Sequence, residues 1–220
     1  MSLLVPLYVH PAEDPGAWAR LIGAVARTHA VVLNPASGPG PRADPAYTAA
    51  AAALRGAGAR LLGYVDTAYG DREGAEANYE FLRYREWYGV DGVFLDRVTA
   101  DRPGLRGCRR LVRSLRGLGA TTVVLNPGVH PEPGYLRLAD LVVTFEGDWA
   151  TYVSAFSRPG WTGRHPPERF CHLVYAVPEA LVPLAVRTAG ERGAAVCGPV
   201  TGVLPNPWSE PSPALTGAEP

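Results

Sequence analysis

Three carboxylates in the sequence follow apolar runs of the kind that form buried strands: Asp66, Asp96 and Glu146. An ionised carboxylate beside apolar surface is costly unless it is paired or used in chemistry. Two carboxylates across a cleft perform glycoside hydrolysis, in which one protonates the leaving oxygen and the other attacks the sugar or activates water. Acids at strand ends can instead cap the next helix or pair with arginines. Asp96 and Glu146 both follow fully apolar runs, and they are the catalytic pair that we predict.

Aromatic and hydrogen-bonding side chains stand at the other expected strand ends. Tyrosine and tryptophan rings can stack on sugars, and asparagine and histidine can bind sugar hydroxyls. We expect five of these residues to line the cleft around the two acids, although Tyr8 and Trp149 could instead pack under loops: Tyr8, His10, Asn34, Asn126 and Trp149. The complete set of expected substrate-binding residues is Tyr8, His10, Asn34, Ser37, Asp66, Tyr69, Arg97, Asn126 and Trp149.

Other chemistries have little support in the sequence. It contains no Gly-x-Ser-x-Gly motif and no lysine for a Schiff base or a phosphate loop. The five histidines lack metal-binding spacings, and the three cysteines form no C-x-x-C motif. We therefore expect no metal, no cofactor and no disulfide. A metal held by His10 with Asp66, Asp96 or Glu146 is the alternative that these residues leave open.

The charge balance excludes several kinds of partner. The 21 basic residues, all arginine, are matched by 21 acidic ones, which removes the electrostatic argument for binding nucleic acid or an anionic membrane. No apolar run reaches the roughly 20 residues of a spanning helix. No basic region or cleavage site precedes the first apolar run, which indicates a cytoplasmic protein, or a secreted one whose leader was removed. The oligomeric state is left open, and the Ala-, Gly- and Pro-rich composition is typical of high-GC bacterial coding.

The candidate residues lie on a chain that alternates β-type and helical runs. Strands are expected near residues 3–10, 30–34, 60–65, 90–95, 121–126, 141–145, 170–175 and 194–200. Helices are expected near 15–28, 45–56, 71–88, 105–118, 133–139, 150–156 and 179–192. Such βα alternation with continuous apolar strands is typical of a parallel sheet covered on both faces.

Eight such units favour an α/β fold of the (β/α)8 TIM-barrel type, short and with its last helix reduced or missing. An open α/β sheet is the alternative, although no G-x-G-x-x-G motif follows the first strand. We expect one barrel domain over residues 1–204 and a Pro-rich C-terminal tail over 205–220. The strands should close in sequence order. Because parallel strands share one carboxyl end, Asn34, Asp66, Asp96, Asn126 and Glu146 should then open onto the same face.

Several segments, in order along nearly the whole chain, resemble the spherulin 4 (spherulation-specific) family. The most specific are an Asn-Pro-x-Ser-Gly-Pro-Gly element and an Asp-Gly-x-Phe-x-Asp element. The matching stretches are Val5-Pro6-Leu7-Tyr8, Asn34-Pro35-Ala36-Ser37-Gly38-Pro39-Gly40, Gly63-Tyr64-Val65-Asp66-Thr67, Trp87-Tyr88-Gly89-Val90-Asp91-Gly92-Val93-Phe94-Leu95-Asp96, Leu125-Asn126-Pro127-Gly128, Thr144-Phe145-Glu146 and Asn206-Pro207-Trp208.

This resemblance implies a barrel glycoside hydrolase that cleaves α-1,4-linked N-acetylgalactosamine or galactosamine polysaccharide. Our leading hypothesis is a retaining mechanism with the two carboxylates, which their separation tests. The family's strand-four and strand-six acids fall on Asp96 and Glu146. Family members often carry Glu after the strand-four Asp, where this chain has Arg97. That difference points to another substrate, lower activity or none. The alternatives are a catalytically impaired, carbohydrate-binding barrel and a barrel hydrolase on another small sugar. Relatives that act on polysaccharide are usually exported, which disagrees with the expected cytoplasmic location and favours the secreted alternative.

Overall fold

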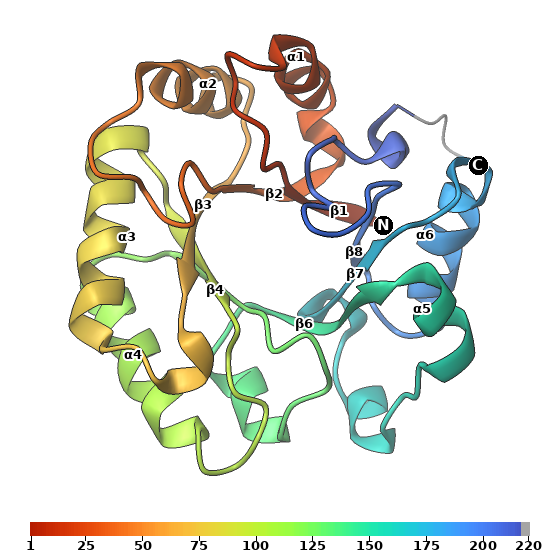
Figure 1. The fold of residues 1–220 in the computed structure, drawn as a ribbon. Coiled ribbons are helices and arrows are strands. Elements are labelled where there is room, and N and C mark those ends of the chain that lie inside the picture. Colours follow the sequence, from red (N-terminus) through yellow and green to blue (C-terminus); the bar gives the residue numbers. More distant parts are fainter. Residues whose placement is uncertain (217–220) are drawn as a thin grey trace.

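The computed structural model describes residues 1–216, and its eight parallel strands form one closed barrel. Each strand pairs with the next along the chain, and β8 pairs with β1 (Figure 1). The predicted TIM-type barrel with strands in sequence order is therefore confirmed. The strands are β1 Ser2–Pro6, β2 Thr28–Leu33, β3 Leu61–Asp66, β4 Gly92–Asp96, β5 Thr122–Leu125, β6 Leu141–Asp148, β7 Phe170–Tyr175 and β8 Val196–Pro199.

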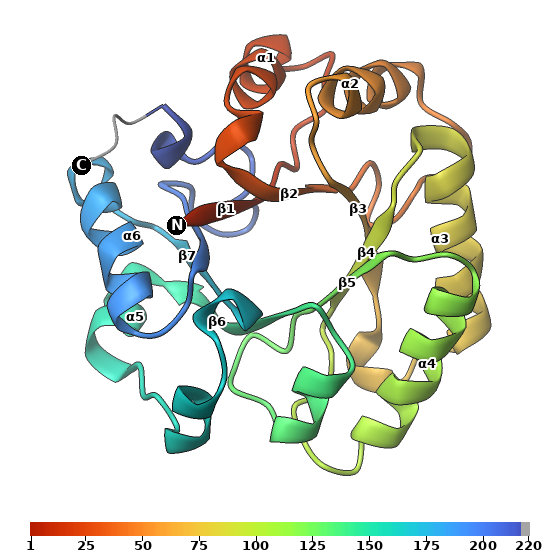
Figure 2. The same cartoon turned by 180° about the vertical axis from the view of Figure 1, so that it is seen from behind.

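Helices surround the ring of strands, as the reverse view also shows (Figure 2). The expected helix between β5 and β6 is a 3-10 segment, η3 Pro133–Arg137. Up to residue 216, the one helical segment after β8 is the short η7 Pro213–Leu215, apart from α6 and η6, which precede β8; this agrees with the reduced or missing last helix expected from the sequence. The α-helices are α1 Pro15–Gly23, α2 Pro45–Gly56, α3 Gly74–Tyr88, α4 Leu105–Gly117, α5 Trp149–Ala155 and α6 Val182–Glu191.

Local signals in the sequence explain where several helices begin and end. Asp14 and Asp44 cap α1 and α2 by accepting hydrogen bonds from backbone N–H groups of the first turn, and a proline follows each of them. Proline suits this position because its missing N–H has no helical partner there. The α3 helix ends at Gly89, whose φ of 64° is the left-handed conformation that glycine adopts without strain.

Alternation along each strand divides the core into two layers. Residues such as Leu62, Phe94 and Val124 face the barrel interior, whereas their neighbours, such as Val93 and Leu125, pack outward against the helices. Strands buried on both faces require continuous apolar runs, which is the pattern in the sequence. Two residues after such an interior position, the side chain faces the interior again. Asp96 follows Phe94 in this way, and Asn126 follows Val124, at the carboxyl end of the strands.

The Pro-rich segment after β8 packs against the barrel rather than projecting from it. Trp208 is buried among the interior residues, and its carbonyl accepts a hydrogen bond of 2.7 Å from the Tyr8 N–H. The segment runs beside β1 and β8 (Figure 1). It therefore helps to form the rim at the carboxyl end of the strands. The last four residues of the expected tail, 217–220, lie outside the described residues.

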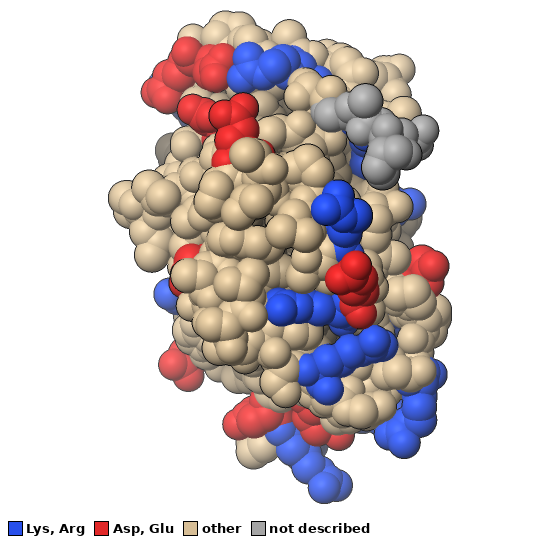
Figure 3. Space-filling model, turned by 90° about the vertical axis from the view of Figure 1, so that its right-hand side faces the viewer, with Lys and Arg blue, Asp and Glu red and all other residues tan. Residues whose placement is uncertain are grey.

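The outer surface is mixed in charge on the side that carries α5 and α6. Acidic and basic side chains are interspersed there on a mainly uncharged face (Figure 3). Over residues 1–216, no helix has the length and apolar content needed to cross a bilayer.

Close packing between strands makes Gly92 sensitive to substitution. A Cβ atom at this position would lie 2.5 Å from the Thr122 carbonyl oxygen and 2.6 Å from a Leu62 methyl carbon. Gly92→Ala is expected to lower the free energy of unfolding by about 1–3 kcal/mol, because an overfilled core forces backbone shifts. Calorimetric melting should show a drop of several degrees. The control is Gly107→Ala in α4, where nothing lies within 4 Å; its Tm should be unchanged or higher, and equal melting of both variants would contradict the packing argument.

Candidate active site

The expected catalytic acids lie at the carboxyl end of the barrel and face its interior. Asp96 ends β4 two residues after the interior residue Phe94. Glu146 reaches the interior through a β-bulge, because the pairing of β6 with β7 shifts between Val143 and Phe145. Simple alternation from Val143 would put Phe145 inside and Glu146 outside. The extra residue reverses that order, as bulges do when they re-aim a side chain.

Asn126 joins the two acids. Its Nδ2 donates a hydrogen bond of 2.7 Å to Asp96 Oδ1 and another hydrogen bond to Glu146 Oε2. Its own Oδ1 accepts from the Gly128 N–H, which fixes the amide orientation. Because one nitrogen reaches both carboxylates, their nearest oxygens lie no farther apart than two hydrogen-bond lengths, roughly 6 Å. This separation fits a retaining pair better than the wider gap that an inverting enzyme keeps for water.

Burial makes both carboxyls weaker acids than usual. It raises the pKa of Glu146 to about 7, and the charge of Asp96 adds to this rise, while the hydrogen bond from Asn126 opposes it. Burial also raises the pKa of Asp96, against the hydrogen bonds from Tyr64 and Asn126. Glu146 can therefore hold a proton near neutral pH, which a general acid requires.

Tyr64 is a site residue that the sequence interpretation did not select. Its hydroxyl donates a hydrogen bond of 2.8 Å to Asp96 Oδ2, and its ring stacks on Phe94 in the barrel interior. It lies two residues before Asp66 on β3, so strand alternation could have placed it on the interior face. Because Tyr64 stands in a mainly apolar run, the sequence favoured a role in core packing for its ring.

A cavity of about 490 Å³ opens above Glu146. Four of the expected residues line it, namely Tyr8, Asn34, Ser37 and Glu146. Tyr175 of β7 and the segment around Asn206 and Trp208 complete the wall. These last residues were missed because the C-terminal segment looked like a tail, although Asn206-Pro207-Trp208 is one of the stretches that carry the family resemblance. The cavity combines aromatic rings with hydrogen-bonding groups, as sugar sites do.

Asp66, Arg97 and Tyr69 form a separate cluster on the rim beside β3 and β4. Arg97 Nε donates a hydrogen bond of 2.8 Å to Asp66 Oδ1, and its guanidinium lies over the Tyr69 ring at 5.5 Å. Arg97 is one of the expected substrate-binding residues, and in the structure it pairs with Asp66 on the neighbouring strand. Asp66 and Tyr69 line a second cavity, of about 580 Å³, between α3 and α4. The cluster of Asp66, Arg97 and Tyr69 therefore lies beside Asp96 and Glu146 and does not connect these two acids.

Two other expected residues make their contacts elsewhere. His10 Nε2 lies 3.1 Å from Asp44 Oδ2 at the start of α2, and the His10 ring meets the edge of Tyr47. Trp149 begins α5 and packs against Tyr152. In the described chain neither has a hydrogen bond to Asp96 or Glu146.

Metal-binding groups do not gather in the part of the chain that the structure describes. No three His, Cys, Asp or Glu side chains in residues 1–216 are arranged to hold an ion. The three cysteines, Cys108, Cys171 and Cys197, are free thiols. At the carboxyl end, Asp96 and Glu146 are instead hydrogen-bonded to Tyr64 and Asn126.

The raised pKa of Glu146 predicts a pH-dependent cost in stability. Folding raises this pKa from 4.5 to about 7, so the folded state binds a proton more tightly than the unfolded state. Stability from this group is then full below about pH 4.5 and declines as pH rises towards 7. Glu146→Gln should therefore be more stable than wild type by about 1–3 kcal/mol at pH 8 and equal to it at pH 4. Urea unfolding at both pH values measures this, and a variant that is less stable at pH 8 would contradict it.

Comparison with known proteins gives the same family as the sequence motifs. The model of spherulation-specific family 4 matches residues 2–193. Spherulin-4 of Physarum polycephalum is 35% identical over 154 residues, which are 66% of this chain and 45% of spherulin-4. The chain thus spans less than half the length of that relative.

Solved structures share the barrel. Aspergillus clavatus Sph3, solved in complex with GalNAc, is 27% identical with a TM-score of 0.84, over 98% of this chain and 94% of Sph3. The Rhizomucor miehei chitinase RmChi1 is 11% identical with a TM-score of 0.55, over 95% of this chain and 98% of its own. That likeness shows the fold alone. The family match covers nearly all of the barrel, including Asp96, Asn126 and Glu146, and the chain therefore belongs to spherulation-specific family 4.

Proposed function

We propose that this chain is a retaining glycoside hydrolase that acts on α-linked N-acetylgalactosamine or galactosamine in polysaccharide or oligosaccharide. The observation that carries the proposal is the hydrogen-bonded set of buried Asn126 with half-buried Asp96 and Glu146 at the carboxyl end of the barrel. The likeness to Sph3, which was solved with GalNAc, supports the choice of sugar.

Glu146 acts as the acid and then as the base in this proposal. Its pKa of about 7 lets it protonate the glycosidic oxygen as the bond to the leaving sugar breaks. The carboxylate that remains then takes a proton from the water that completes hydrolysis. Glu146 lines the open cavity, so a substrate oxygen can reach it.

Asp96 supplies the second carboxylate. As the nucleophile, it attacks the anomeric carbon and forms a glycosyl ester that water later hydrolyses. The alternative role is to orient the substrate's N-acetyl group, whose carbonyl oxygen then attacks the anomeric carbon. In either role the hydrogen bonds from Tyr64 and Asn126 hold Asp96 in position and favour its charged form.

The cavity residues bind the sugar. Tyr8, whose ring packs edge-on against Tyr64, and Tyr175 offer aromatic faces beside Glu146. Asn34 and Asn206 supply amides for sugar hydroxyls, although Asn34 Oδ1 already accepts from the Gly38 N–H. Neutral polar groups with aromatic platforms suit an uncharged N-acetylated sugar.

The test is digestion of α-1,4-linked galactosamine oligomers, with and without N-acetyl groups, by the purified chain. Mass spectrometry should detect shorter oligomers, and proton NMR of the first product should show the α-anomer. A β-anomer would exclude retention. No turnover on any of these oligomers would contradict the hydrolase proposal.

A carbohydrate-binding barrel without catalysis is the second candidate. Arg97, which stands where family relatives often have Glu, is held by Asp66 and adds no carboxylate to the site. Binding of the same oligomers by calorimetry, with no products after long incubation, would favour this candidate. Turnover of a different small sugar by the same site would instead point to another hydrolase specificity.

A further inference from the structure

The α4 helix carries an unusual concentration of positive charge. Its 13 residues include five arginines and no acidic residue. Several of these arginines are three or four positions apart, which makes them neighbours on the helix surface, and like charges at that spacing destabilise a helix. Repulsion between these arginines therefore disfavours α4, although the chain as a whole has no net charge. The arginines are Arg106, Arg109, Arg110, Arg113 and Arg116.

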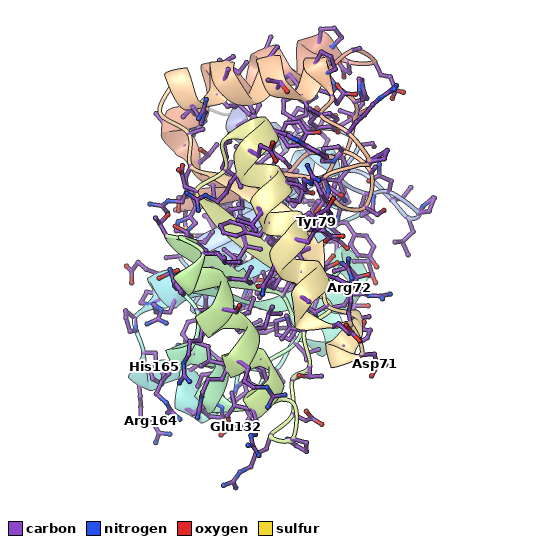
Figure 4. The ribbon with its side chains drawn as sticks, turned by 90° about the vertical axis from the view of Figure 1, so that its left-hand side faces the viewer. Asp71, Arg72, Tyr79, Glu132, Arg164 and His165 are labelled. Carbon is purple, nitrogen blue, oxygen red and sulfur yellow. The ribbon has the colours of Figure 1, made fainter. Side chains whose placement is uncertain are left out.

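Part of this charge faces a groove of about 810 Å³ on the outside of the barrel. Three α4 arginines line one wall, and residues 136–140, His165 and Arg169 line the other. Figure 4 shows α4 beside the segment that carries His165. Asp140 is the one carboxylate among the lining residues, against five guanidinium groups. The groove arginines are Arg109, Arg113, Arg116, Arg137 and Arg169.

Two of these arginines have structural partners. Arg116 forms an ion pair of 2.5 Å with Asp140. Arg169 donates to backbone carbonyls, including that of Asp140 at 2.9 Å. Both therefore hold the groove in shape. Asp140 directly precedes β6, so this end of the groove lies at the amino end of the strands, away from the Glu146 cavity.

The other three arginines are available to a ligand. Arg109, Arg113 and Arg137 are exposed, and within residues 1–216 none of them has a hydrogen bond or an ion pair. Arg109 and Arg113 are one turn apart on α4, and Arg137 ends η3 across the groove. By contrast, acidic and basic groups alternate on the α5–α6 side (Figure 3).

We propose that this groove binds an acidic polysaccharide, with Arg109, Arg113 and Arg137 contacting carboxylates of successive uronic acid residues. A guanidinium fork matches a carboxylate with two parallel hydrogen bonds. The open groove, with charge on both walls, suits an extended chain rather than a single ion. The choice of a glycan over other polyanions rests on the proposed function. A single-stranded nucleic acid fits less well because the groove offers no aromatic ring for base stacking except His165.

The test is calorimetric titration of the purified chain with oligogalacturonate at low and at physiological salt. Binding is expected with the acidic oligomer, weaker at higher salt, and absent with its fully methyl-esterified form. The double variant Arg109→Gln/Arg113→Gln should weaken binding by about tenfold or more, since each lost fork removes a charge-assisted pair. Glutamine keeps a good helix propensity, so α4 should still fold.

The matched control is Arg106→Gln/Arg110→Gln, which removes the same charge from the same helix. These arginines line the cavity between α3 and α4 instead of the groove, so binding should change less than threefold. An equal loss in both variants would mean general attraction to α4 and would overturn the groove. Tighter binding of a single-stranded oligonucleotide would overturn the choice of polysaccharide.

The experiment distinguishes a failure of the proposed groove binding from a failure of the proposed hydrolase function. Groove binding is measured without turnover, so an inactive chain can still bind oligogalacturonate through Arg109 and Arg113. Conversely, an active hydrolase whose binding of the acidic oligomer is absent, or is unchanged in Arg109→Gln/Arg113→Gln, would refute the groove alone.

Discussion

Glu146→Gln is expected to lower turnover of α-linked galactosamine oligomers by about 10²–10⁴-fold, the usual contribution of a general acid. Glutamine keeps the size of the side chain and can still bond to Asn126, but it cannot deliver a proton to the glycosidic oxygen. Steady-state kinetics should show the loss in kcat, with KM little changed. Wild-type activity should fall as pH rises above about 7, since burial holds the pKa of Glu146 there.

The control for Glu146 is Asp148→Asn, two residues further along β6. Asp148 is a carboxylate on the same strand, but its oxygens accept from the N–H and hydroxyl of Thr151 at the start of α5. Asparagine retains that capping role, so kcat should stay within a few-fold of wild type. A Glu146→Gln variant with full turnover would remove Glu146 from the mechanism.

Asp96→Asn is expected to reduce turnover at least as strongly, because no glycosyl ester or charge-stabilised intermediate can then form. Tyr64→Phe should lower kcat much less. It removes one hydrogen bond to Asp96 but leaves the carboxylate in place. Loss of this bond should raise the pKa of Asp96 further, which moves the acid limb of the pH profile upward. Full activity of Asp96→Asn would refute the carboxylate pair.

The substrate's N-acetyl group separates the two roles proposed for Asp96. If Asp96 is the nucleophile, Asp96→Asn should lose activity equally on N-acetylated and deacetylated oligomers. If Asp96 orients the N-acetyl group, the wild type should cleave only N-acetylated linkages. Comparing kcat/KM on the two oligomers, for wild type and variant, decides between these roles.

The amino-acid sequence by itself determined the architecture and the end of the barrel at which the acids lie. Continuous apolar runs such as Val31-Val32-Leu33 and Val123-Val124-Leu125 require strands buried on both faces. Eight of them alternating with helical segments leave few arrangements other than a closed parallel barrel. Since all parallel strands end on one side, Asp96, Asn126 and Glu146 had to lie at the same end. The ion pair of Arg97 could also be anticipated, because Asp66 ends the neighbouring strand and can accept a hydrogen bond from it.

Only the tertiary structure decided which of these side chains meet. Glu146 faces Asn126 because of the bulge between Val143 and Phe145, and a shift in pairing between β6 and β7 depends on both strands. Tyr64 and Trp208 joined the site because the barrel closes around them, although each looks like core or tail along the chain. His10 was expected at a strand end, but β1 ends at Pro6, and His10 contacts Asp44, the N-cap of α2. Strand periodicity sets the end of the barrel, whereas local register and the reach of neighbouring loops set the contacts, and these depend on residues far apart in the sequence.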